Sequence, residues 1–160
     1  MKTIAINAEI TEAIAGDLAQ NQMFAEFKKE DLKKVAAGAT FLQPDAGEEV
    51  MKQGDKADGF YLVMSGEAIV KVQQAGKGDA VEVARIKPFD TIGEIGVLLG
   101  QPRSATIVAS ADTMLLKFDD KFFQNMFKTM PDFGLATCRI MARRLQQSSR
   151  NILPSSGGKG

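Results

Sequence analysis

A short stretch in the second half of the chain combines glycines, one carboxylate and one guanidinium at a spacing that suits anion binding. Gly93 and Glu94 open an apolar run that is bracketed by glycines, and Arg103 follows Pro102 at the start of a β-branched segment. A helix that begins near Glu94 exposes backbone N–H groups without intrahelical partners, and a preceding glycine lets a ligand approach the backbone. The guanidinium of Arg103 can pair with two oxygens of a phosphate monoanion. We therefore expect residues 92–106 to bind a phosphate.

The carboxylate of Glu94 needs a different partner, because it would be repelled by a phosphate beside it. A carboxylate accepts hydrogen bonds, and a neutral sugar hydroxyl donates one. A sugar joined to a cyclic phosphodiester, with its single negative charge, is then the smallest ligand that satisfies both groups. Each residue alone is weak evidence, since an arginine after a proline is most often a solvated surface residue. The interpretation depends on the combination over residues 92–106.

Composition argues against several classes of site. The 160 residues include no histidine and one cysteine, Cys138, so the usual ligands of zinc, haem iron and iron–sulfur clusters are missing, as is the commonest general acid or base. We expect no metal, no cofactor and no enzymatic activity. Twenty Lys and Arg against twenty Asp and Glu give a formal charge of zero, which is not typical of a protein that binds nucleic acid or anionic membranes directly. Without a signal sequence or an apolar run of about 18 residues, a cytoplasmic location is expected.

Hydrophobic periodicity predicts one α+β domain over residues 1–152. Residues 1–37 are assigned to N-terminal helices, because helical spacing over residues 8–37 with a break near Asn21 predicts two short helices. Residues 40–119 alternate short β-branched runs with glycine-containing turns, which is typical of an antiparallel β-roll of the jelly-roll or double-stranded β-helix kind. Residues 120–152 return to helical spacing around Pro131, and residues 153–160 are expected to be a flexible tail.

Two apolar runs inside the predicted roll are close enough along the chain to pair with each other. Residues 60–64 and 68–72 are separated by Ser65, Gly66 and Glu67, a connection whose length is compatible with a β-hairpin. We therefore expect these two runs to form adjacent antiparallel strands. Their apolar side chains are expected to belong to the core, as buried side chains of these types usually do.

The phosphate-binding stretch resembles the cassette of cyclic nucleotide-binding domains, the family shared by protein kinase A regulatory subunits, cyclic nucleotide-gated channels and the catabolite activator protein. The resemblance rests on residues 93–95 and 102–106, and it extends from about residue 24 to 151, including Gly54-Asp55 and residues 60–66. It implies that Glu94 binds the ribose 2′-hydroxyl and Arg103 the cyclic phosphate. The candidate ligand-binding residues that it implies in this stretch are Gly93, Glu94, Ile95, Arg103, Ser104, Ala105 and Thr106.

The last predicted helix is similar to the long C-terminal helix of the catabolite activator type over residues 141–149. In that type paired hydroxyl residues contact the adenine, which implies that Ser148 and Ser149 contact the base, one of them across a dimer interface. The alternative is that both are surface serines at a helix end. An apolar seam on the same helix is compatible with a parallel homodimer or with packing against the chain's own roll. The residues of this seam are Cys138, Met141, Leu145, Ser148 and Ile152.

The expected function is that of a cyclic-nucleotide sensor that signals by moving its C-terminal helices. The resemblance favours cAMP over cGMP, because Ser104 rather than a threonine follows Arg103. A cGMP-selective module remains open, as does a dimeric sensor that acts through a separate DNA-binding partner, since no helix-turn-helix domain follows in the sequence. A regulatory unit that belongs with a channel or signalling enzyme is a further alternative, so the effector is unknown. An enzyme on a jelly-roll scaffold is disfavoured by the lack of histidine.

Overall fold

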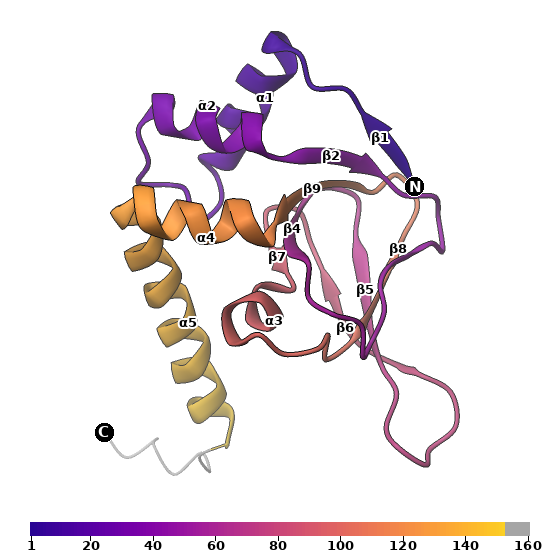
Figure 1. Ribbon diagram of the computed structural model, residues 1–160. Coiled ribbons are helices and arrows are strands. Elements are labelled where there is room, and N and C mark those ends of the chain that lie inside the picture. The colour runs from indigo at the N-terminus through magenta and orange to yellow at the C-terminus, as the bar shows by residue number, and fades with distance from the viewer. Residues whose placement is uncertain (153–160) are drawn as a thin grey trace.

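The computed structural model describes residues 1–152, with side chains described up to residue 150, and it shows an antiparallel β-roll with helices gathered on one side (Figure 1). The first sheet has the order β1-β2-β9-β4-β7 and the second the order β3-β8-β5-β6. The strands are β1 (Lys2–Ile4), β2 (Thr40–Gln43), β3 (Glu49–Met51), β4 (Gly59–Ser65), β5 (Ala68–Val72), β6 (Val81–Ile86), β7 (Thr91–Ile92), β8 (Thr106–Ala109) and β9 (Met114–Asp119). The helices are α1 (Ala8–Leu18), α2 (Lys29–Gly38), α3 (Glu94–Leu99), α4 (Asp120–Thr129) and α5 (Pro131–Ile152). The α+β roll and the short helix within it are confirmed.

The N-terminal segment differs in detail from the prediction. Asn7 caps α1 by accepting a hydrogen bond from the backbone N–H of Ile10 at 2.8 Å. After α1 the chain forms turns, and the second helix begins at Lys29, so Phe24 and Phe27 lie before it instead of within it. The first strand, β1, lies inside the segment that was assigned to helices and was not predicted; it pairs with β2 at the start of the roll.

A cluster of phenylalanines joins the helices to the first sheet. Phe60 of β4 stacks on Phe118 of β9 with ring centroids 4.8 Å apart, and Phe24 stacks on Phe133 of α5 at 5.7 Å. Phe123 of α4 links the two pairs, since its ring lies 4.6 Å from that of Phe60 and 5.6 Å from that of Phe133. All five rings are buried, and such pairs stabilise a core beyond the area that they remove from water. A separate apolar cluster fills the space between the two sheets.

The predicted hairpin between residues 60–64 and 68–72 is wrong. The strand β4 pairs with β7 and β9, whereas β5 pairs with β6 and β8 in the other sheet. Gly66 between them has a φ of 73°, and a Cβ there would lie 2.6 Å from the Cα of Thr113. The connection is therefore a tight corner at which the chain changes sheets, and a short loop between two apolar runs does not distinguish that corner from a hairpin turn.

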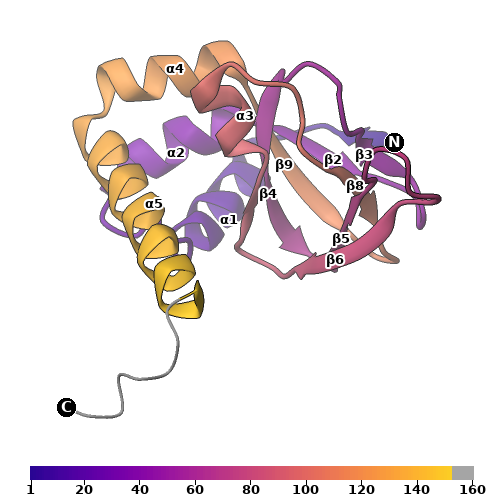
Figure 2. The same ribbon diagram turned by 90° about the horizontal axis from the view of Figure 1, so that it is seen from below.

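The last helix, α5, packs through its first half. Phe133, Ala136 and Ile140 are buried at helical spacing, whereas every described side chain from residue 142 to 150 is exposed. The ribbon shows the last turns of α5 extending away from the other helices (Figure 2). In the predicted seam, Cys138, Leu145 and Ser148 are exposed, and Met141 packs partly against the core. Of the described seam residues, only Met141 therefore packs against the chain's own core, and the side chain of Ile152 lies outside the described residues. The predicted flexible tail, residues 153–160, also lies outside them.

Candidate ligand-binding site

The predicted cassette lines a cavity of about 180 Å³ between the two sheets and α3. Its apolar wall comes from strands of the second sheet, through Met51, Val70, Ile86 and Ile107. Its polar side is formed by β7, by the first turn of α3 and by the segment before β8. The predicted residues that line it are Gly93, Glu94, Ile95, Arg103, Ser104 and Ala105. An apolar wall with a few convergent polar groups is typical of a small-molecule site.

Gly93 is required by the local geometry of the cassette. It precedes α3 in the left-handed conformation, with a φ of 84° that side-chain-bearing residues rarely adopt. A Cβ on this residue would lie 2.5 Å from Nη1 of Arg103 and 2.9 Å from the terminal methyl group of Met51. The missing side chain therefore lets the guanidinium lie directly against the backbone at the start of the helix.

The side chain of Arg103 is 2% exposed and borders the cavity. Its Nη1 donates to the carbonyl oxygen of Gly93 at 2.9 Å, and its Nη2 donates to the carbonyl oxygen of Gly59 at 2.6 Å and to Oδ1 of Asp58 at 3.1 Å. The N–H on Nε and the second N–H on Nη1 have no partner among the described residues. The guanidinium is thus held in place by the protein and retains donors for an anion.

Asp58 lies between two cations, because its second oxygen, Oδ2, accepts a hydrogen bond from Nζ of Lys117. Burial by itself raises the pKa of the Asp58 carboxyl group. The hydrogen bond from Lys117 and the attraction of Lys117 and Arg103 outweigh that effect, so the pKa is lowered from its ordinary value. At neutral pH the group formed by Asp58, Arg103 and Lys117 therefore has one carboxylate, one guanidinium and one ammonium group.

Glu94 is 3% exposed, and its Oε1 accepts a hydrogen bond from Nη1 of Arg144 on α5. Nη2 of Arg144 lies 3.4 Å from the hydroxyl oxygen of Thr91. The other oxygen, Oε2, has no donor among the described residues, so the carboxylate can accept a further hydrogen bond. The partnership with Arg144 was not predicted, because no local pattern relates residues that are 50 positions apart.

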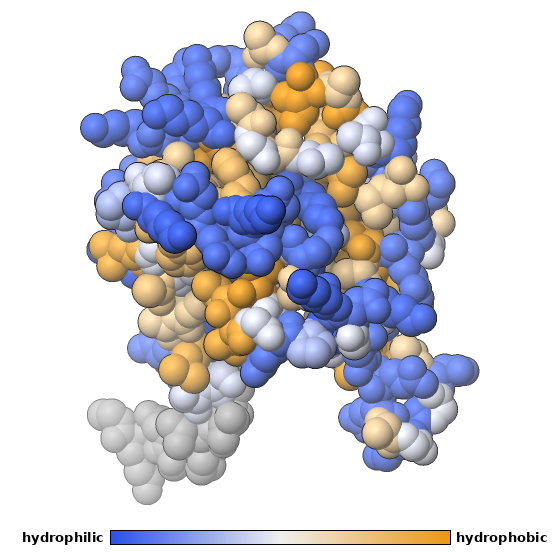
Figure 3. All heavy atoms as spheres, viewed as in Figure 1, coloured by the Kyte–Doolittle hydropathy of each residue, from blue (hydrophilic) through white to orange (hydrophobic). Residues whose placement is uncertain are grey.

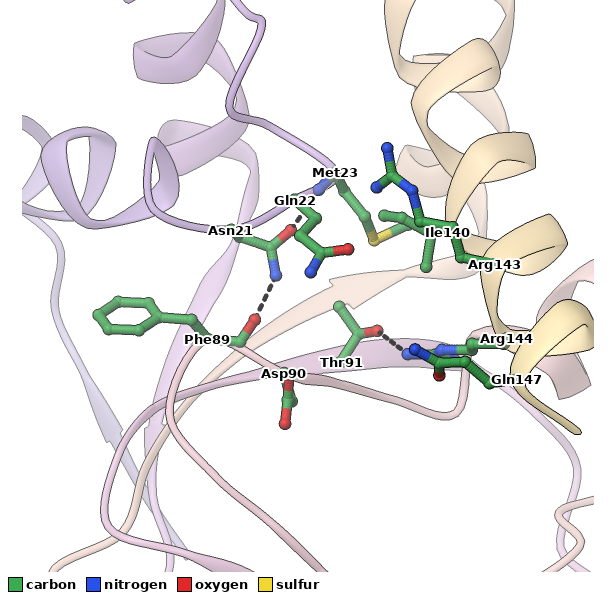
Figure 4. A pocket seen from close by; sticks show the side chains of 10 residues that line it. All are labelled: Asn21, Gln22, Met23, Phe89, Asp90, Thr91, Ile140, Arg143, Arg144 and Gln147. Carbon is green, nitrogen blue, oxygen red and sulfur yellow. Dashed lines mark hydrogen bonds between the residues drawn. The ribbon is translucent and has the colours of Figure 1, made fainter. Parts of the chain in front are cut away.

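A second cavity of about 190 Å³ also has Thr91 in its wall (Figure 4). It is enclosed by the turn around Asn21, the loop before β7 and α5, from which Arg143, Arg144 and Gln147 extend. Asn21 shapes this region by donating from Nδ2 to the carbonyl oxygen of Phe89, a residue with a φ of 71°. Thr91 lines both cavities, and Arg144 contacts it, so the two spaces adjoin at α5.

Three predicted residues are not brought to the first cavity. The hydroxyl of Thr106 accepts a hydrogen bond from the backbone N–H of Gln53 at 3.0 Å, which joins the start of β8 to the loop after β3, and Thr106 is not part of the cavity wall. Ser148 and Ser149 lie on the exposed last turns of α5 and line neither of the two cavities. The sequence reasoning also missed Asp58, Thr91 and the apolar wall.

Three further properties of residues 1–152 bear on the class of protein. This part of the chain contains no cluster of three or more His, Cys, Asp or Glu side chains arranged to bind a metal ion. None of its helices combines the length and the apolar character needed to traverse a lipid bilayer. Beyond the roll and its flanking helices, the described residues contain no helix-turn-helix domain.

Comparison with known proteins agrees with this geometry. The sequence of residues 42–130 matches the family described as the cyclic nucleotide-binding domain. The lysophospholipase nte1 of Aspergillus oryzae is 28% identical over 119 residues, which make up 74% of this chain but 8% of that protein, so this chain spans a small fraction of that relative's length.

Two solved structures illustrate the similarity in fold. A cyclic nucleotide-binding domain from Methylobacillus flagellatus has a TM-score of 0.77 at 22% identity, with 97% of this chain and 89% of that chain covered. A cAMP-binding acyltransferase from Mycobacterium smegmatis has a TM-score of 0.69 at 31% identity, with 88% of this chain and 43% of that chain covered. Because the family match spans more than half of the chain and the cassette lines a cavity, this chain belongs to the cyclic nucleotide-binding domain family.

Proposed function

We propose that this chain is a cAMP sensor that reports ligand binding through α5. Its family is one of regulatory modules that bind cyclic nucleotides. The observation that carries the proposal is the presence of two buried charged residues, Arg103 and Glu94, on the polar side of an otherwise apolar cavity. Buried charged side chains are costly unless they are paired, and here each has a protein partner and an atom left for a ligand.

The position of the ligand follows from the hydrogen-bonding atoms of Arg103 and Glu94 that have no partner among the described residues. The cyclic phosphate lies at Gly93 and Arg103, where the Nε and Nη1 donors face an anion. The ribose 2′-hydroxyl donates to Oε2 of Glu94, while Oε1 stays bonded to Arg144. The base lies along the apolar wall that includes Val70 and Ile86. Adenine is supported by Ser104 after the cassette arginine and by the similarity to a cAMP-binding acyltransferase at 31% identity.

The signal is a movement of α5 toward the cassette. Beyond Ile140, the described side chains of α5 hydrogen-bond to the rest of the chain only through Arg144. A ligand that hydrogen-bonds to Glu94 therefore affects the Arg144–Glu94 contact, which anchors the second half of α5. Apolar side chains of α3 are exposed next to it: Leu98 is 41% and Leu99 62% exposed, and the space-filling view shows apolar surface over α3 and the adjoining side of α5 (Figure 3). Closure would bury this surface, which favours the closed state.

Titration calorimetry with cAMP, cGMP and 5′-AMP tests the ligand assignment. We expect cAMP to bind most tightly and 5′-AMP most weakly, because an open phosphate carries more charge and lacks the ring that fits the cassette. Tighter binding of cGMP would change the assigned base from adenine to guanine, and the assigned contacts to phosphate and sugar would stand. Equal or absent binding of all three would refute the proposal.

Movement of α5 can be measured directly by spin labels. With Cys138→Ser removing the single native thiol, labels on Leu99→Cys and Leu145→Cys report the distance between α3 and the end of α5. Saturating cAMP is expected to shift the distance distribution to shorter values. The matched control places the second label at Lys29→Cys on α2, where the distance to Leu99 should not change. An unchanged Leu99–Leu145 distance in a protein that binds cAMP would refute the movement.

Dimerisation through α5 is part of the same proposal. Leu135 is 53% and Leu145 70% exposed, and the neighbouring Cys138 is exposed as well, so a partner helix could cover this side of α5. Sedimentation equilibrium with and without cAMP would measure the assembly. We expect a dimer that Leu145→Glu dissociates, whereas a monomer under both conditions would show that α5 acts within one chain. The effector that reads the movement stays unidentified.

A further inference from the structure

We propose that Lys117 sets the affinity of the cyclic-phosphate site through Asp58, as a positioning residue that never contacts the ligand. The inference rests on the proposed function, because it concerns how many hydrogen-bond donors of Arg103 remain available to the ligand phosphate. Lys117 was not part of the predicted site, and it lies on β9, outside the cassette.

The three charged residues form a chain that leads from the surface to the buried guanidinium. Asp58 accepts from Nη2 of Arg103 with Oδ1 and from Nζ of Lys117 with Oδ2. The exposed fraction of the side chain is 57% for Asp58, 26% for Lys117 and 2% for Arg103. Lys117 also makes a cation–π contact, because its Nζ lies 5.6 Å from the ring centroid of Tyr61, the buried residue that is paired with it on β4.

Asp58 competes with a ligand phosphate for the same cation. Both are anions that accept hydrogen bonds from the guanidinium of Arg103, and a carboxylate with two free oxygens can bind a guanidinium through both of them. Lys117 occupies one of these oxygens, so Asp58 holds Arg103 through a single oxygen. Without Lys117 the carboxylate is free to turn and engage a second N–H, which would remove a donor from the phosphate.

The net charge of Arg103, Asp58 and Lys117 leads to the same expectation, since the other charged pair of the site, Glu94 and Arg144, sums to zero. Arg103 and Asp58 together are neutral, and Lys117 brings the sum to one positive charge, which matches the single negative charge of a cyclic phosphodiester. Neutralising Lys117 would leave the ligand facing a neutral pair. Both arguments predict weaker binding without Lys117, but only the competition for Arg103 requires the carboxylate of Asp58 to be present, so the dependence on Asp58 tests that competition.

A double-mutant cycle on the full chain tests this dependence by calorimetry with cAMP. Lys117→Gln should weaken binding about 3- to 10-fold, the scale of coupling between neighbouring charged side chains. In the Asp58→Asn background the same substitution should change the affinity less than about 2-fold. Lys117→Arg keeps the charge and should restore the affinity of the wild-type chain. Lys121→Gln removes the charge of an exposed lysine on α4 and serves as the control with unchanged affinity.

Several results would overturn the proposal. Unchanged affinity in Lys117→Gln refutes a role for the residue, and an equal loss in both backgrounds shows that it acts independently of Asp58. Thermal unfolding of each variant checks that the fold is kept; if Lys117→Gln does not fold, Lys117→Met enters the same cycle. A wild-type chain that binds no cyclic nucleotide refutes this inference together with the proposed function. If the wild-type chain binds cAMP but the double-mutant cycle shows no coupling between Lys117 and Asp58, this inference is refuted and the proposed function stands.

Discussion

Arg144 on α5 donates a hydrogen bond to the buried carboxylate of Glu94 on α3, and this contact joins the cassette to the C-terminal helix. The side chain of Arg144 is 44% exposed, whereas that of Glu94 is 3% exposed, so α5 supplies the more accessible partner of the pair. Because coupling between two sites is reciprocal, a ligand that acts on Glu94 biases α5, and a change in α5 alters ligand affinity.

Replacement of Arg144 by glutamine should therefore weaken cAMP binding and reduce the movement of α5. The carboxylate of Glu94 would lose the partner that orients it toward the sugar, and we expect a loss of about 3- to 30-fold, or about 0.6–2 kcal/mol. For 2′-deoxy-cAMP, which cannot donate to Glu94, Arg144→Gln should cause little further loss. Calorimetry with both ligands checks this; Arg143→Gln is the control on the same helix. Equal losses for both ligands would show that Arg144 does not act through the sugar contact.

Truncation of Arg103 to alanine should remove at least about 1.5–3 kcal/mol of binding free energy, the scale of a hydrogen bond to a charged group. Arg103→Lys keeps the positive charge but loses the planar set of donors, so it should recover part of the loss. Affinities of both variants for cAMP are measured after circular dichroism has verified the fold. Wild-type affinity in Arg103→Ala would refute the phosphate assignment.

A methyl group at Gly93 should disrupt the site more than one at Gly76. Both glycines have a left-handed φ, of 84° and 76°, so both substitutions carry the backbone cost of about 1–2 kcal/mol. At Gly93 the added Cβ also meets Nη1 of Arg103 at 2.5 Å, whereas at Gly76 nothing lies within 4 Å. Gly93→Ala should therefore abolish cAMP binding that Gly76→Ala retains. Comparable affinities in the two variants would contradict the close approach of Arg103.

The docking of the helices onto the first sheet should depend on Phe133. Its ring is fully buried and contacts those of Phe24 and Phe123, so Phe133→Ala should lower the free energy of unfolding by about 3–5 kcal/mol. Leu135 is 53% exposed on the same helix, and Leu135→Ala should have little effect. Urea denaturation measures both. Similar losses in the two variants would argue against the phenylalanine cluster as the main contact of α5.

An ion pair between α1 and α2 should make stability depend on pH in the acid range. Glu12 contacts Lys29 and Lys33, and hydrogen bonds from these lysines lower the pKa of Glu12 to about 2 from the ordinary 4.5. A carboxyl group with a lowered folded-state pKa stabilises the fold above its unfolded value, and this contribution is lost as the pH falls from 4.5 toward about 2. The melting temperature of Glu12→Gln should thus lie slightly below that of the wild-type chain at pH 7, and the two should converge near pH 2. A constant difference across this range would rule out the ion pair as the cause.

Local patterns in the sequence determined the fold class and the stretch that lines the first cavity. Glycines beside a short apolar run and Arg103 after Pro102 are features of neighbouring residues, and they placed the cassette and α3 correctly. Hydrophobic periodicity likewise separated the helices from the roll. The same kind of reasoning failed at Gly66, because the choice between a hairpin and a corner depends on Thr113 in a distant segment.

Only the tertiary structure decided which residues complete the site. Asp58, Thr91, Lys117 and Arg144 come from separate elements, and the partners of Arg103 and Glu94 could not be read from spacing along the chain. Packing also left Ser148 and Ser149 on exposed turns, away from the cavity. Local conformation depends on short-range steric and hydrogen-bonding preferences that a sequence window contains. The pairing of buried charges depends on how sheets and helices pack, and that is settled by the whole chain.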